Sequence, residues 1–362
     1  MPATEIDRVA LARYFQRRAE SDAFSGVALI TQGNRQLFAG AYGFASRAWK
    51  IPNTLATRFD TASVTKLFTA VATLQLIERG LLAFDTPVVE TLALLRGTAI
   101  SPAVTVSHLL THTSGIADDA EEESGEDYAD LWKTKPNYSV LETADFLPQF
   151  AYKPPNFPPG QGCRYCNCGY VLLGLLIEHA SGLSYRDYVR QSVFAPAGMS
   201  RSGFFRQDVV TEDVAEGCDP VRGEQGGVVA WRKNIYSYPP IGSPDGGAHV
   251  TASDLEGFLR ALQAGALLSV PSVQAFFTPR VLHHVGAEWK VMYGYGIEFA
   301  VDESGGVLFA EKEGINAGVS AVLRHYPARD ITVVLLGNTQ LGVWEPRKAI
   351  HRLLTEGVMP QA

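Results

Sequence analysis

Segments with the pattern of β-strands lie at both ends of this chain of 362 residues, and the stretch between them is mostly helical in pattern. Near the N-terminus, residues 26–33 and 36–43 flank a turn at Gly33-Asn34-Arg35, which predicts a hairpin. Toward the other end, short β-like runs cover residues 296–299, 307–310, 318–325 and 331–336. Because one core must bury the apolar faces of these strands, we predict a single mixed sheet built from both termini.

The same pattern divides the chain into two regions. We expect residues 1–62 and 285–362 to form an α/β sheet region and residues 63–284 a mainly helical region, with an active site at their junction. Helical signals cover residues 1–20, 63–80, 105–111, 169–182, 187–194, 253–264 and 346–354.

Composition excludes several classes of function. The formal net charge of −7 and the pI near 5.7 disfavour nucleic acid as a partner. The chain has no unbroken apolar run of about 18 residues, so we expect no membrane span. Residues 1–20 lack the apolar core and cleavage site of a secretory signal, which predicts the cytoplasm as the compartment.

Ser63-Val64-Thr65-Lys66 opens the predicted helix over residues 63–80. Residues three apart share a helix face, so Ser63 and Lys66 should lie side by side in its first turn. A Lys held among apolar groups and other cations can lose its charge and take the proton of a Ser hydroxyl. On its own, the Ser-x-x-Lys pattern is more often an exposed Lys one turn after a capping Ser. Other segments of the chain must therefore show whether this pair is catalytic.

Two further motifs follow in order, Tyr165-Cys166-Asn167 and Lys312-Glu313-Gly314, and residues 109–115 read Leu-Leu-Thr-His-Thr-Ser-Gly. Ser-x-x-Lys and Tyr-x-Asn each occur once. In this order and spacing the segments resemble the class C β-lactamase-like serine hydrolases. That family also contains D-alanyl-D-alanine carboxypeptidases, D-aminopeptidases and family VIII carboxylesterases.

The resemblance implies a β-lactamase/transpeptidase-like α+β fold, with an antiparallel sheet flanked by helices and an inserted, mostly helical region. It implies that Ser63 attacks a carbonyl carbon and becomes an acyl-enzyme, while Lys66 and Tyr165 relay the hydroxyl proton. Lys312 would place positive charge near Tyr165 and favour its phenolate.

For substrate binding, the resemblance implies an oxyanion hole made by the backbone N–H groups of Ser63 and Ile315, beside Gly314. Asn167 would orient the carbonyl side of the substrate. No metal or organic cofactor is required. His284-Val285-Gly286 is a competing third motif, but it precedes the Tyr-Gly-Tyr-Gly segment at 293–296, whereas Lys312 follows it.

Glu313 departs from the family pattern, which often has Thr there to receive a substrate carboxylate. A carboxylate at this place would repel the carboxylate of a β-lactam, so we expect esters to react better than β-lactams. The alternative is that Glu313 points away and pairs with a nearby cation.

Three other clusters have alternative interpretations. Cys163, Cys166 and Cys168 could begin a metal site, but only Cys218 remains as a partner, so free thiols are expected. His108 and His112 have a zinc-like spacing without an accompanying Glu, which favours structural roles. Residues 118–130 contain eight carboxylates and no Lys or Arg, as in a solvated loop or a negative rim over a site.

These observations favour a carboxylesterase acting on small acyl esters. The alternative is an amide hydrolase, either a D-aminopeptidase, a D,D-peptidase or a weak β-lactamase. A non-catalytic penicillin-binding scaffold would not need Ser63, Lys66 and Tyr165 together. The expected partner is therefore a small-molecule ester or amide, and the oligomeric state stays open.

Overall fold

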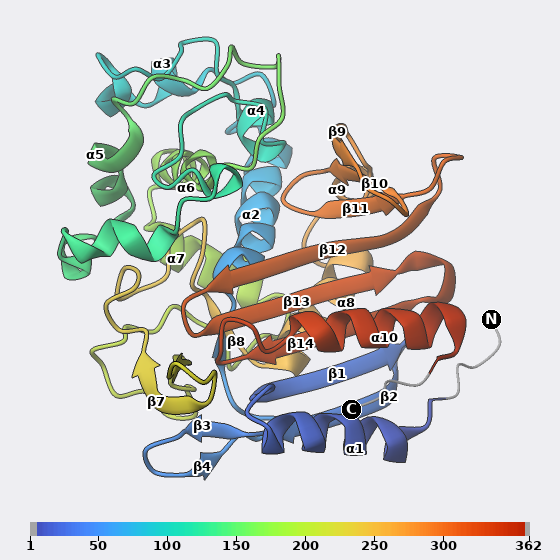
Figure 1. Ribbon diagram of the computed structural model, residues 1–362. Helices are drawn as coiled ribbons and strands as arrows, with labels where there is room; N and C mark the ends of the chain where they lie inside the picture. Colours follow the sequence, from blue (N-terminus) through green and yellow to red (C-terminus); the bar gives the residue numbers. More distant parts are fainter. Residues whose placement is uncertain (1–5, 359–362) are drawn as a thin grey trace.

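An eight-stranded sheet dominates the computed structural model, which describes residues 6–358 (Figure 1). Its strand order is β2-β1-β14-β13-β12-β11-β10-β9, and every neighbouring pair is antiparallel. The prediction of a mixed sheet is therefore wrong, because neighbouring strands are joined by hairpins or by long excursions rather than by helical crossovers between parallel strands. The strands are β1 (Gly26–Gln32), β2 (Arg35–Tyr42), β9 (Val281–Val285), β10 (Lys290–Tyr293), β11 (Glu298–Val301), β12 (Val307–Asn316), β13 (Val319–Tyr326) and β14 (Ile331–Gly337).

The strands predicted near both termini are present, but β9 and β10 were not predicted. Strand β9 is one of the two edge strands of the sheet and most of its side chains are exposed, so its sequence lacks the apolar alternation of a half-buried strand. The boundary expected between residues 284 and 285 falls inside β9.

Helices cover both faces of the sheet. Because side chains alternate along a strand, Ala28 and Ile30 of β1 belong to one apolar cluster and Val27 and Leu29 to the other. The first cluster is completed by α1 (Arg8–Glu20) and α10 (Trp344–Glu356), which lie over the same face in Figure 1. The second includes α2 (Lys66–Glu78) and α8 (Ala252–Gln263).

Helix α2 is the centre of the helical region, and every residue from Lys66 to Leu76 is buried. A helix that is apolar on all sides must be surrounded by other elements, and α2 packs against α6 (Asn167–Ser181) and α7 (Tyr185–Val189). The remaining α-helices are α3 (Val88–Thr91), α4 (Val106–Leu110), α5 (Leu147–Phe150) and α9 (Val270–Phe276).

Three small strand pairs lie outside the main sheet: β3 (Phe44–Ser46) with β4 (Ile51–Pro52), β5 (Phe59–Asp60) with β8 (His249–Val250), and β6 (Cys218–Arg222) with β7 (Val228–Lys233). The pair β5–β8 brings residues 59–60, directly before Ser63, against the loop that precedes α8. Among residues 6–358, none of the helices has the length and apolar character needed to cross a bilayer.

Candidate active site

Ser63 lies in a tight turn before α2, not in the first turn of the helix itself. A 3-10 helix spans Ala62–Thr65 and α2 begins at Lys66, so the α-helix begins three residues later than predicted. Ala62 has a φ of +41°, a left-handed conformation that costs a non-glycine residue about 1–3 kcal/mol. The Asp60 carboxylate holds this turn by accepting the Ala62 N–H at 2.7 Å. The turn leaves Ser63 partly exposed.

Lys66 contacts Ser63 directly, as the spacing predicts. Its Nζ lies 3.1 Å from Ser63 Oγ, 2.7 Å from Asn167 Oδ1 and 2.6 Å from the backbone oxygen of Asp245. Burial of the ammonium group lowers the pKa of Lys66 to about 8, since the nearby Asp245 carboxyl opposes this shift only in part and the charge of Lys312 adds to it.

The three partners of Lys66 fix where its lone pair can point. A neutral lysine amine has two N–H donors and one lone pair. If both donors serve Asn167 Oδ1 and the Asp245 oxygen, which can only accept, the lone pair faces the Ser63 hydroxyl. The arrangement can therefore take a proton from Ser63 Oγ without rearrangement.

Tyr165 lies between two lysines. Lys66 Nζ is 4.9 Å and Lys312 Nζ is 4.8 Å from the centroid of its ring, so the predicted proximity of Lys312 is present. The prediction that Lys312 favours the phenolate is not supported, since burial raises the pKa of Tyr165 well above its usual value. Its buried hydroxyl makes no well-aligned hydrogen bond among the described residues. The nearby Ser63 side chain opposes the rise in the pKa of Tyr165 only in part. Tyr165 is therefore a neutral phenol that can pass a proton.

Lys312 is an almost fully buried ammonium that pairs with Glu298, at 2.8 Å. Glu298 was missed in the sequence because it follows the Tyr-Gly-Tyr-Gly segment without any motif of its own. Its position depends on β11 pairing with β12: Glu298 begins β11 beside Glu311, and its carboxylate reaches the next residue of β12, Lys312. Lys312 thus supplies a fixed positive charge, partly neutralised by a carboxylate.

Glu313 does not join the other predicted site residues. Consecutive residues of β12 face opposite sides of the sheet, so Glu313 points away from the side that holds Lys312. Its carboxylate contacts the Arg347 guanidinium of α10, which also lies 3.0 Å from Glu311. The alternative stated for Glu313, a pairing with a nearby cation, is what the structure has.

Gly314 and Ile315 do border Ser63. A Cβ added to Gly314 would lie 2.0 Å from the Thr61 carbonyl oxygen and 3.0 Å from the Ser63 backbone nitrogen, so only glycine allows β12 to approach this turn. Ile315 lines the same cavity as Ser63. The two residues of the predicted oxyanion hole, Ser63 and Ile315, therefore lie close together. That their backbone N–H groups donate to a substrate oxygen stays a prediction.

The acidic segment 118–130 packs against the second motif instead of forming a wholly solvated loop. Asp118 is buried, and its carboxylate accepts the backbone N–H groups of Asn167 at 2.9 Å and of Cys168 at 2.8 Å. Glu122 accepts from Asn167 Nδ2 at 2.9 Å and Glu123 from the Tyr165 N–H at 2.8 Å. Of the two alternatives for this segment, the negative rim is closer to the observed arrangement.

The histidines have structural partners. His108 Nδ1 accepts the Thr105 N–H at 3.2 Å, and His112 Nδ1 accepts the Cys166 N–H at 3.1 Å. The His112 ring lies 4.6 Å from the Tyr165 ring, centroid to centroid, and burial lowers its pKa well below the usual value. His112 therefore supports the Tyr165 ring as a neutral, packed side chain.

All four cysteines are free thiols, as expected. Within residues 6–358, one group of candidate metal ligands lies close together, namely Asp118, Asp119 and Cys168. Both Asp118 oxygens already accept backbone hydrogen bonds from the start of α6, which explains this carboxylate without a cation.

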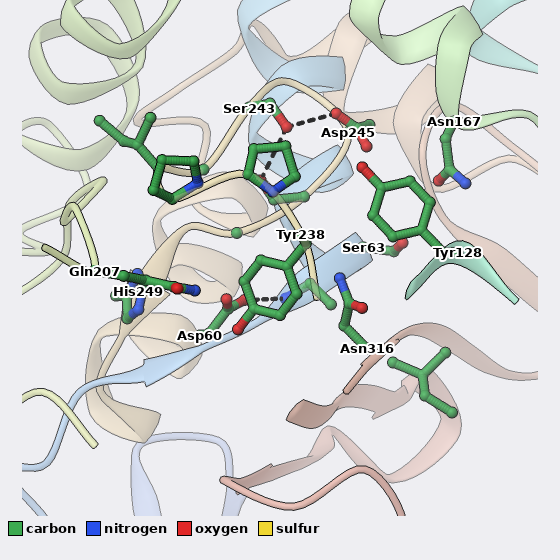
Figure 2. Close-up of a pocket in the computed structure, with 18 of the residues that line it drawn as sticks. Asp60, Ser63, Tyr128, Asn167, Gln207, Tyr238, Ser243, Asp245, His249 and Asn316 are labelled. Carbon is green, nitrogen blue, oxygen red and sulfur yellow. Dashed lines mark hydrogen bonds between the residues drawn. The ribbon is translucent and has the colours of Figure 1, made fainter. Parts of the chain in front are cut away.

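A cavity of about 580 Å³, counted with its open mouth, reaches Ser63 from solvent. Figure 2 shows Ser63 on its wall, with Asp245 and Asn167 on one side and Asn316 on the other. Three carboxyl groups line it, those of Asp60, Glu122 and Asp245, and its described lining contains no Lys or Arg. Polar side chains missed in the sequence, such as Tyr128, Gln207, Tyr238 and His249, complete the lining.

A serine hydroxyl facing a lysine of lowered pKa, beside a neutral tyrosine, defines an acyl-transferring serine hydrolase. The family model for beta-lactamase matches residues 11–356, and the chain belongs to this family of serine hydrolases. The predicted β-lactamase/transpeptidase-like α+β fold, with its antiparallel sheet, is thereby confirmed.

Individual relatives have several activities in their names. Over 348 residues the chain is 28% identical to penicillin-binding protein 4* of Bacillus subtilis, covering 92% of this chain and 72% of the relative. It is 33% identical to esterase EstB of Burkholderia gladioli over 215 residues, 56% of this chain and 54% of that protein. A solved penicillin-binding protein from Bacillus halodurans superposes with a TM-score of 0.85 at 40% identity, covering 93% of this chain and 99% of the other.

Proposed function

We propose that this serine hydrolase is a carboxylesterase that forms an acyl-enzyme on Ser63. The observation that carries the proposal is the 3.1 Å hydrogen bond between Lys66 Nζ and Ser63 Oγ on the wall of an open cavity. Lys66 takes the hydroxyl proton as Ser63 Oγ attacks the ester carbonyl. Tyr165 then donates its proton to the departing alkoxide and is reprotonated by the Lys66 ammonium, and water later hydrolyses the acyl-enzyme to release the acid.

The charges of the cavity support neutral acyl esters as substrates. Asp60, Glu122 and Asp245 line it, so a substrate carboxylate would meet like charge. The positive charges of Lys66 and Lys312 lie nearby, but both are reduced. The lowered pKa of Lys66 makes its charge easier to lose, and the Glu298 carboxylate offsets the charge of Lys312. Discrimination against β-lactams therefore comes from this lining and not from Glu313.

The same lining supports a second candidate, an amide hydrolase for substrates with a free amine. An ammonium group would be attracted by the carboxylates that repel a β-lactam. Esters remain the first choice because an alkoxide can leave with less help from a proton donor than an amide nitrogen, and the raised pKa makes Tyr165 a weak donor.

The test is kcat/KM for p-nitrophenyl butyrate, D-alanine p-nitroanilide and nitrocefin, with Ser63→Ala as control. We expect the ester to exceed nitrocefin by roughly 100-fold, because part of the like-charge repulsion at about 4 Å is offset by the lysines. A higher value for the anilide would select the amide hydrolase. No turnover of any substrate would favour the scaffold.

We also propose that the protein acts in the cytoplasm. Cys163, Cys166 and Cys168 are crowded together as free thiols, which suits a reducing compartment. Extraction from intact cells followed by thiol labelling would test this, since an oxidised pool would argue for export.

A further inference from the structure

The side-chain amide of Asn167 is held from both ends. Its Oδ1 accepts from Lys66 Nζ at 2.7 Å, while its Nδ2 donates to Glu122 Oε2 at 2.9 Å and to Asp118 Oδ2 at 3.3 Å. Asn167 is 5% exposed, so water does not compete freely for these groups. An ionised carboxylate can only accept, and the amide nitrogen can only donate.

We propose that Asp118 and Glu122 are positioning residues that set the orientation of the Asn167 amide and, through it, the direction of the Lys66 lone pair. This inference rests on the proposed function, in which Lys66 is the base for Ser63. If the amide rotated by half a turn, its NH₂ group would face Lys66. The lysine lone pair could then accept from Nδ2 and would no longer be reserved for the Ser63 hydroxyl.

Asp118 is held in place by several hydrogen bonds, so it can fix the orientation of the Asn167 amide. Its carboxylate also accepts the first backbone N–H groups of α6, at Asn167 and Cys168, where the helix dipole favours negative charge. Its own N–H donates to Glu121 Oε1 at 2.9 Å, and Lys153 Nζ binds its backbone oxygen at 2.7 Å. The Asp118 carboxylate thereby ties the acidic segment to the start of α6 and, through the Asn167 amide, to Lys66.

Glu122 is the better residue to test, because it is exposed and its removal leaves the buried Asp118 contacts intact. Glu122→Gln removes the charge but keeps an acceptor for Asn167 Nδ2, whereas Glu122→Ala removes both. Asp130→Ala is the matched control, because Asp130 is an exposed carboxylate of the same segment that pairs with Lys133.

The two effects of Glu122 act in opposite directions, so they can be separated. Its negative charge raises the pKa of Lys66, so losing the charge alone would make Lys66 a better-populated base at neutral pH. Losing the orientation would lower the rate even at high pH, where Lys66 is already neutral. The high-pH plateau therefore reports orientation, and the midpoint of the rise reports charge.

The experiment measures the rate of Ser63 labelling by a fluorophosphonate against pH, in the wild type and in an Asn167→Ala background. In the wild type, Glu122→Ala should lower the plateau about tenfold, the size expected for losing a hydrogen bond to a charged group, while Glu122→Gln and Asp130→Ala stay within about twofold. In the Asn167→Ala background, Glu122→Ala should change the plateau by less than about twofold, because nothing remains to be oriented.

Equal penalties for Glu122→Ala in both backgrounds would overturn the inference, since Glu122 would then act without Asn167. An unchanged plateau for Glu122→Ala in the wild type would overturn it as well. A wild-type enzyme that is not labelled at Ser63 would instead overturn the proposed function.

Discussion

Lys66 and Lys312 are both buried beside Tyr165, yet their surroundings differ. Lys66 contacts three neutral oxygens, those of Ser63, Asn167 and the Asp245 backbone, and its pKa is lowered to about 8. Lys312 contacts the carboxylate of Glu298 at 2.8 Å. A buried lysine with neutral partners can release its proton near neutral pH, which makes Lys66 the one of the two that can act as a base.

The two lysine side chains are chemically identical, but their surroundings give them different roles. In the proposed mechanism Lys66 exchanges a proton with Ser63, whereas the charge of Lys312 lowers the pKa of Lys66 from across Tyr165. Changes at the two positions should therefore differ in size and in kind.

The largest effect should come from Lys66. Lys66→Met removes the base but keeps an unbranched side chain, so kcat/KM for p-nitrophenyl butyrate should fall about 1,000-fold, within the usual range for general-base catalysis. Adding Tyr165→Phe should cost much less than it does alone, because both groups move the same proton. Steady-state kinetics of the two single variants and the double variant measure this. Penalties that multiply would contradict a shared proton path.

The second-largest effect should be a shift in the pH dependence of kcat/KM when Lys312 is replaced. In the wild type, kcat/KM should rise with pH through about 8, because Lys66 acts as a base only after it loses its proton. Lys312→Met removes a neighbouring positive charge, so the pKa of Lys66 should rise and the midpoint should move to higher pH. A shift of about one pH unit would lower the rate at pH 7 about tenfold. A midpoint that stays in place or moves down would contradict the role given to Lys312.

Breaking the Lys312 pair should affect stability more than chemistry. Glu298→Gln leaves the buried ammonium with a neutral partner, so the free energy of unfolding should fall by about 1–3 kcal/mol, less than for a fully buried pair because Glu298 is 24% exposed. Urea denaturation measures the change, with Glu345→Gln on the exposed pair to Lys348 as control. Equal effects of the two substitutions would show that burial of Lys312 adds nothing.

The smallest effect should come from Glu313. Because its carboxylate pairs with Arg347 on the far face of β12, Glu313→Thr should leave the ratio of kcat/KM for ester and nitrocefin unchanged within about twofold. The partly exposed pair should contribute no more than about 1 kcal/mol to stability. A ratio that narrows markedly would restore Glu313 as a selector of substrate charge.

The parts of the site that were predicted depend on short-range spacing or on family resemblance. Ser63 and Lys66 are three residues apart, and a helical turn of either type brings them together. Tyr165, Asn167 and Lys312 were found only through the resemblance, since nothing local indicates that they approach Ser63. Strand alternation alone could have placed Lys312 and Glu313 on opposite faces, and that signal was overlooked.

The parts that were missed depend on tertiary packing. Glu298 reaches Lys312 through the pairing of β11 with β12, and Asp118 reaches α6 from a segment whose composition is typical of a solvated loop. An acidic run is normally solvated because burying a carboxylate is costly. Here the start of α6 offsets that cost with two backbone donors for Asp118.

The most direct test of the account is the site of covalent modification. The protein is incubated with a fluorophosphonate at pH 8.5, where Lys66 is largely neutral, and the adduct is mapped by tandem mass spectrometry. We expect one adduct, on Ser63, that is absent in Ser63→Ala and forms far more slowly in Lys66→Met. An adduct on another serine, with Ser63 unmodified, would contradict it.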